Sequence, residues 1–181
     1  MHAVTVKPSH LEKTAGPQSV SQVYGLGVQI YELTLESLKM IKPNCADKSG
    51  SIQYYIRKLT AGKKELLDYF YFTLNNEISF FYQNKGLLLK EAGQLDPDEQ
   101  ELIIYPILNS YSLKLRQLEE IVKLMDTDNE NEVAMICLEL ADNLYSVFRQ
   151  LSHLYPIVEL RTLFKEMAQM LQNNTAVWIS I

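Results

Sequence analysis

Residues 104–154 read IYPILNSYSLKLRQLEEIVKLMDTDNENEVAMICLELADNLYSVFRQLSHL and carry the pattern that decides the fold. Apolar residues recur there at alternating spacings of four and three, in two stretches. The first is Ile104, Leu108, Tyr111, Leu115, Leu118, Val122 and Met125; the second is Val133, Cys137, Leu140, Leu144, Val147, Leu151 and Leu154. Such spacing averages about 3.5 residues, the period that keeps one stripe of a helix against a partner helix. Because only a polar turn at 126–129 separates the stretches, the sequence predicts two antiparallel helices whose stripes face each other.

Three further helical segments are predicted around this hairpin. Pro17 suits the first position of a helix and Pro43 cannot continue one, so a helix is expected between them. A second segment covers residues 51–92 and ends at Gly93, where a left-handed cap is expected. Gly62 lies inside it and costs about 1 kcal/mol relative to alanine, so a kink or break is expected there. A shorter helix near the C-terminus places five apolar residues on one face: Ile157, Leu160, Phe164, Met167 and Leu171.

The predicted fold is all-α, an up-down bundle of four long helices and one shorter C-terminal helix, in a single domain over residues 17–175. The chain has 181 residues, of which 47% are hydrophobic, and is long enough to bury a core. Residues 1–16 show little periodicity and are expected to form a mobile arm. Residues 176–181 form an apolar tail with the only tryptophan, Trp178. We expect this tail to dock on the core or on a second subunit; the alternative is a peptide that a partner protein binds.

Composition excludes several classes of protein. The formal net charge is −5, which disfavours non-specific binding of nucleic acid, because that binding needs a clustered basic surface. No apolar run approaches the roughly 18–20 residues that a membrane span requires. The two cysteines are too far apart for a metal-ligand pair, and no disulfide framework or secretory signal is evident. We therefore expect a cytoplasmic protein.

Groups that carry catalysis are scarce. Two of the three histidines, His2 and His10, lie in the predicted arm, and only His153 lies in a predicted helix. A carboxylate-bridged metal site in a helix bundle needs paired Glu-x-x-His motifs, which the chain lacks. No nucleophile elbow and no phosphate-binding glycine loop are present. The sequence thus predicts no catalytic residue, no metal site and no cofactor, and it favours a protein that is not an enzyme.

Aromatic residues are concentrated in the second predicted helix. Residues 54–82 hold nine of the eighteen aromatics of the chain, including four in a row at 69–72. Four consecutive aromatics cover a full helical turn, so this helix is expected to be central, wrapped by its neighbours or by another subunit. Buried polar residues within it would need hydrogen-bond partners, which tyrosine hydroxyls could supply. The candidate ligand-binding or interface residues are Tyr69, Phe72, Asn76, Glu77, Phe80, Tyr82 and Trp178.

Two functions fit this pattern. We expect a non-catalytic helical interaction protein, such as an adaptor, regulator or assembly factor, that forms homo-oligomers and could also bind another protein. The alternative is a binding protein for an apolar or aromatic small molecule, held beside the aromatic helix at 69–82.

Overall fold

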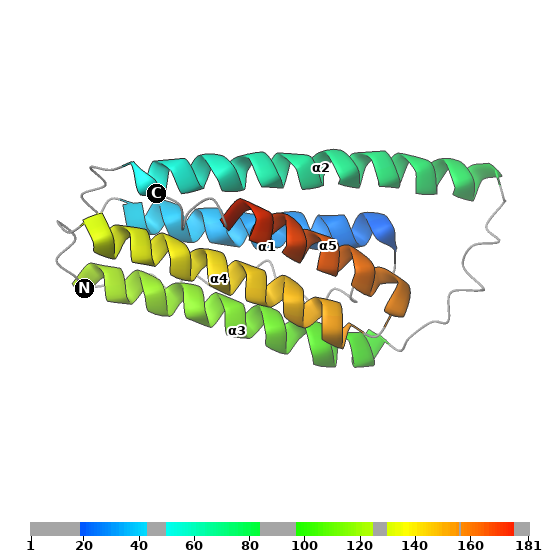
Figure 1. Cartoon of the computed structure of the whole chain (residues 1–181). Helices are drawn as coiled ribbons and strands as arrows, with labels where there is room; N and C mark the ends of the chain where they lie inside the picture. Colours follow the sequence, from blue (N-terminus) through cyan, green and yellow to red (C-terminus); the bar gives the residue numbers. More distant parts are fainter. Residues whose placement is uncertain (1–18, 43–49, 84–96, 125–129, 156, 176–181) are drawn as a thin grey trace, which may run out of the picture.

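The computed structural model describes residues 19–42, 50–83, 97–124, 130–155 and 157–175. Within these ranges the chain forms five α-helices and no strand (Figure 1). The helices are α1 (Val20–Ile41), α2 (Ser51–Gln83), α3 (Pro97–Leu124), α4 (Glu130–Leu154) and α5 (Val158–Thr175). In Figure 1 successive helices alternate in direction along a common axis. The predicted all-α helix bundle is confirmed.

The two stripes of the predicted hairpin lie in the core. From Ile104 to Val122, and from Val133 to Leu151, each stripe residue is buried. Leu154 is an exception, because it is 54% exposed at the end of α4. Met125 lies outside the described residues. The 3.5-residue period therefore identified the buried faces of α3 and α4 correctly over almost their whole length.

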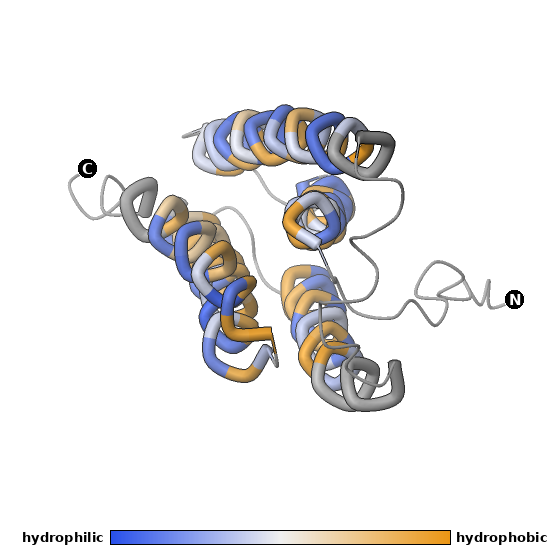
Figure 2. The backbone as a smooth tube through the Cα atoms, turned by 90° about the vertical axis from the view of Figure 1, so that its right-hand side faces the viewer, coloured by the Kyte–Doolittle hydropathy of each residue, from blue (hydrophilic) through white to orange (hydrophobic). Residues whose placement is uncertain are grey.

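The central helix is α1. It packs against each of the other four helices, whereas α2 packs mainly on α1 and to a smaller extent on α4. Figure 2 shows α2 above α1 at the edge of the bundle. The expectation that the aromatic helix is wrapped by its neighbours in this chain is therefore wrong. The abundance of aromatics was not a guide to the central helix, because α1 has few aromatics and still buries a broad face. This face includes Ile30, Tyr31, Thr34 and Leu38.

Polar contacts between side chains establish that α1 and α2 are antiparallel. Lys42 Nζ donates to Gln53 Oε1 at 2.6 Å, and Lys63 forms an ion pair with Glu32 at 3.0 Å. As the residue number falls in α1, it rises in α2. Both contacts are exposed, so they contribute little to stability and mainly report the register of the two helices.

Two helix details differ from the sequence predictions. Pro17 lies before the described residues, and α1 begins at Val20 because the Ser19 side chain accepts a hydrogen bond from Gln22 N. The helix α2 continues through Gly62 without a break. A Cβ at Gly62 would lie 2.9 Å from Cε1 of Tyr31, so this glycine makes room for the tyrosine ring. Gly62 therefore serves helix packing instead of interrupting the helix.

The helix α5 closes the bundle against α4 and α1. Arg161 Nε donates a hydrogen bond to the carbonyl of Tyr155, and the rings of Tyr155 and Phe164 meet edge to face. The predicted apolar face is confirmed, since Leu160, Phe164, Met167 and Leu171 are buried. In the part of the chain that the structure describes, no helix is long and apolar enough to cross a membrane. The predicted arm at 1–16 and tail at 176–181 lie outside the described residues.

Candidate interaction surfaces

The second half of α2 presents large apolar side chains to solvent. Tyr69, Tyr71, Phe72 and Ile78 are 45%, 55%, 66% and 44% exposed. We call these four residues the aromatic face of α2. Three of the four belong to the run of aromatics at 69–72, and a full turn of aromatics cannot be buried against α1 with only a smaller contact to α4. Within the run at 69–72, Phe70 packs closely on α1, where its ring lies 3.4 Å from the position of a Cβ at Gly25.

Of the predicted site residues, Tyr69, Phe72 and Asn76 lie close together on one side of α2. Their spacing of three and four residues places them along adjacent turns, and all three are exposed. The Tyr69 ring stacks on the ring of Tyr24 from α1, with centroids 5.3 Å apart. Burial and then the nearby carboxylate of Glu166 on α5 raise the pKa of Tyr24. The rings of Tyr24 and Tyr69 are thus in direct contact with each other.

Glu77 has a structural role that the sequence did not reveal. Its carboxylate accepts hydrogen bonds from the Ser21 backbone N at 3.0 Å and from the Ser21 hydroxyl at 2.5 Å. Ser21 lies in the first turn of α1, where unpaired backbone N–H groups and the helix dipole favour a negative charge. The expected tyrosine partners are therefore replaced by a helix N-terminus. Glu77 fixes α2 on the start of α1 and is directed away from the aromatic face.

The remaining predicted site residues are outside what the structure describes. Phe80 and Tyr82 belong to α2 by their backbone, but their side chains are not described. Trp178 lies in the tail beyond Thr175. Their proposed contribution to an interface or a pocket stays a prediction.

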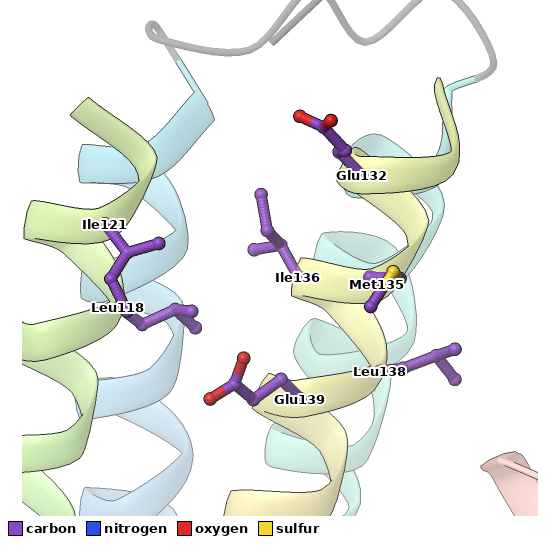
Figure 3. A pocket seen from close by; sticks show the side chains of 7 residues that line it. All are labelled: Leu118, Ile121, Glu132, Met135, Ile136, Leu138 and Glu139. Carbon is purple, nitrogen blue, oxygen red and sulfur yellow. The ribbon is translucent and has the colours of Figure 1, made fainter. Parts of the chain in front are cut away.

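A second surface lies between α3 and α4, and it was not predicted. A shallow cavity of about 290 Å³ is lined by Leu118 and Ile121 of α3 and by Glu132, Met135, Ile136, Leu138 and Glu139 of α4 (Figure 3). Figure 3 shows Leu118 and Ile121 directed from α3 toward α4, Glu139 directed from α4 toward α3, and Glu132 near the start of α4. We call this cavity the α3/α4 groove.

Much of the apolar surface around the groove is open to solvent. Ile121 is 49% exposed and Met135 is 67% exposed, and Leu124 at the end of α3 reaches 88%. The sequence did contain a signal for this surface. Ile121, Met135 and Leu138 are large apolar residues that fall outside the two buried stripes, and their number on neighbouring turns exceeds what a fully solvated helix face usually carries.

The interior of the bundle contains a layer of hydroxyl groups. The Tyr111 hydroxyl lies 2.5 Å from Thr34 Oγ1, and Thr34 Oγ1 also donates to the carbonyl of Ile30 at 2.9 Å. Burial raises the pKa of Tyr31, Tyr55 and Tyr111 far above the usual value. These hydroxyls therefore stay protonated at neutral pH, and the Tyr111 hydroxyl serves as a hydrogen-bonding group of the core.

The described residues offer little for catalysis. They contain no cluster of three or more His, Cys, Asp or Glu side chains that could hold a metal ion. His153 is exposed in the last turn of α4, and Cys137 is buried among core residues. The surfaces with the most pronounced chemistry are thus the aromatic face of α2 and the α3/α4 groove.

Comparison with known proteins gives no relative. The chain matches no model of a protein family, no curated protein and no solved structure.

Proposed function

We propose that this protein is a non-catalytic helical interaction protein that self-associates through the aromatic face of α2. The observation that carries the proposal is the exposure of Tyr69, Tyr71, Phe72 and Ile78, which lies between 44% and 66%. Soluble monomers rarely leave large apolar patches open, and such patches mark sites of protein association. Aromatic side chains are also enriched at the centres of interfaces, because they bury a large area and lose few rotamers.

The position of α2 supports this proposal. Exposed aromatic side chains on a helix can be buried either by other helices of the same chain or by another chain. Within the described chain, α2 lies at the edge of the bundle and packs mainly on α1. A second copy would bury the rings of Phe72 and Tyr71 without any change in the monomer fold.

The alternative function, binding of an apolar or aromatic small molecule beside residues 69–82, has less support. Ligand pockets are usually concave and have volumes of about 300–1,000 Å³. The α3/α4 groove has no lining residue from α2, so it is not the pocket that this alternative requires. In addition, the Tyr24 and Tyr69 rings stack directly, so a flat ligand would have to separate them.

Sedimentation velocity of the purified chain at micromolar concentrations tests the proposal. We expect at least a dimer for the wild type, and a monomer for Phe72→Glu, because a charge at the centre of an apolar interface would be buried without a partner. Leu113→Glu is the matched control: Leu113 is 55% exposed on α3, outside the aromatic face. It should leave the mass unchanged, and circular dichroism should show that both variants keep the fold.

Two results would overturn the proposal. One is a wild-type chain that stays monomeric at high concentration. The other is equal dissociation by Phe72→Glu and Leu113→Glu, which would make the effect one of charge alone. A monomer that co-purifies with an absorbing compound, lost on unfolding, would support the small-molecule alternative instead.

A further inference from the structure

The α3/α4 groove combines apolar walls with negative charge at its edge. The α3 side contributes only Leu118 and Ile121 to the lining, and the α4 side contributes three apolar residues and two glutamates. From Asn131 to Phe148, α4 carries Glu132, Glu139 and Asp142 and no lysine or arginine. The surface next to the groove is therefore acidic along the exposed side of α4.

The two glutamates are regularly placed. Glu132 and Glu139 are seven residues apart, so they lie on the same side of α4, separated by about 10.5 Å along its axis. Along α4 the side chain of Ile136 lies between the two glutamates, and Ile121 of α3 is directed toward it from the other side of the groove (Figure 3). A partner helix lying along the groove would present cations at the same seven-residue spacing and apolar residues in the turn between them.

We propose that the α3/α4 groove binds an amphipathic helix of another protein, one with Lys or Arg at positions i and i+7 and Leu or Ile at positions i+3 and i+4. The cations pair with Glu132 and Glu139, and the apolar side chains enter the groove against Ile121 and Met135. A volume of about 290 Å³ suits one or two large side chains of a partner. The exposed thioether of Met135 can adapt to the shape of the inserted side chain.

A second copy of this chain is the competing occupant. Arg57 and Lys64 are exposed on α2 and are also seven residues apart. The residues between them on α2 that are exposed include Thr60 and Ala61, which are too small to fill the groove. A partner with large aliphatic side chains between its cations fits the groove better, which is why we assign it to a different protein.

Binding of a labelled synthetic helix, made of Ala, Leu and Lys in the stated arrangement, tests the inference by fluorescence anisotropy. The Phe72→Glu background removes the self-association proposed above, so the two proposals can fail separately. We expect Glu132→Lys/Glu139→Lys to weaken binding about tenfold, because two favourable charge pairs become repulsive. Ile121→Ser should weaken binding as well, through the loss of an apolar contact, and binding to the unaltered groove should decrease as salt is raised.

Matched controls separate a specific groove from general attraction between a basic peptide and an acidic protein. Glu36→Lys/Asp68→Lys makes the same change in net charge at exposed positions of α1 and α2, and it should leave the affinity within about twofold. A peptide of the same composition in a scrambled, non-amphipathic order should bind more weakly than the designed helix.

Three outcomes would overturn the inference. The first is the absence of binding by the designed peptide. The second is an equal loss of affinity in the groove variant and in Glu36→Lys/Asp68→Lys. The third is assembly of the chain with itself that Glu132→Lys/Glu139→Lys abolishes and that mixing with Arg57→Glu/Lys64→Glu restores, since a second copy would then be the occupant.

Discussion

The hydrogen bond between Tyr111 and Thr34 predicts an unequal effect of removing its two partners. Thr34 Oγ1 uses its own proton for the carbonyl of Ile30, so the Tyr111 hydroxyl donates to Thr34. Tyr111→Phe removes this donor and leaves Thr34 with its bond to the backbone. Thr34→Val instead leaves the Tyr111 hydroxyl in the core without the partner to which it donates, and both positions are buried.

The magnitudes follow from this asymmetry. Loss of one net hydrogen bond in Tyr111→Phe should lower the free energy of unfolding by about 0.5–1.5 kcal/mol. Thr34→Val should lower it by about 1–3 kcal/mol, because a buried donor then pays its full desolvation cost. The double variant replaces both polar groups by apolar ones and should cost less than Thr34→Val alone. The coupling energy between the two sites should therefore be about 1 kcal/mol or more.

Urea unfolding of the four proteins, followed by far-ultraviolet circular dichroism, measures these differences. Thr60→Val is the matched control, since Thr60 Oγ1 makes the same bond to the carbonyl four residues earlier but is exposed. It should change the free energy of unfolding by less than about 0.5 kcal/mol. If Tyr111→Phe costs as much as Thr34→Val, or if the two effects add, then the proposed direction of the hydrogen bond is wrong.

Three further predictions concern packing and pH. Gly62→Ala should destabilise the fold by about 1–2 kcal/mol, because the added Cβ would lie 2.9 Å from the Tyr31 ring. In Gly25→Ala the nearest contact of the added Cβ is 3.4 Å, so thermal melts should show this variant to be neutral or more stable by up to about 1 kcal/mol. Leu144→Ala should lower the free energy of unfolding by about 2–5 kcal/mol, because Leu144 is fully buried, and Leu154→Ala should lower it by less than about 1 kcal/mol, because Leu154 is 54% exposed. Urea midpoints measure the two effects, and equal effects would contradict the predicted hairpin core. Burial raises the pKa of the core tyrosines Tyr31 and Tyr111 above the unfolded value of about 10, so the free energy of unfolding should be constant below pH 10 and should fall above it by about 1.4 kcal/mol per pH unit for each such tyrosine. In an alkaline titration, tyrosinate absorbance should therefore rise cooperatively with unfolding, and gradual ionisation of all tyrosines in the folded chain would contradict this prediction.

Part of the candidate site could be predicted from the sequence. The run of aromatics at 69–72 led to the selection of Tyr69 and Phe72, and both side chains are exposed in the structure; their role in binding stays a prediction. Glu77 was predicted as a site residue because it lies in the same aromatic segment. Its partner Ser21 is 56 residues away, and no local sequence pattern indicates that the Glu77 carboxylate reaches the first turn of another helix. The α3/α4 groove was missed because its residues come from two helices and lie beside the periodic stripes.

What the sequence determined by itself is the all-α fold, the residues of the buried stripes in α3, α4 and α5, and the presence of more aromatic surface than one stripe can bury. These features are local: they depend on spacing along one helix and on the chemistry of its ends. Only the tertiary structure decided that α1 is central, that α2 continues through Gly62, and that the aromatic face is open. These depend on which helix lies beside which, and similar apolar stripes are compatible with several arrangements of a bundle. In the observed arrangement Gly62 of α2 makes room for the ring of Tyr31 of α1, and Thr34 of α1 is hydrogen-bonded to Tyr111 of α3, so shape and hydrogen bonding match between neighbouring helices.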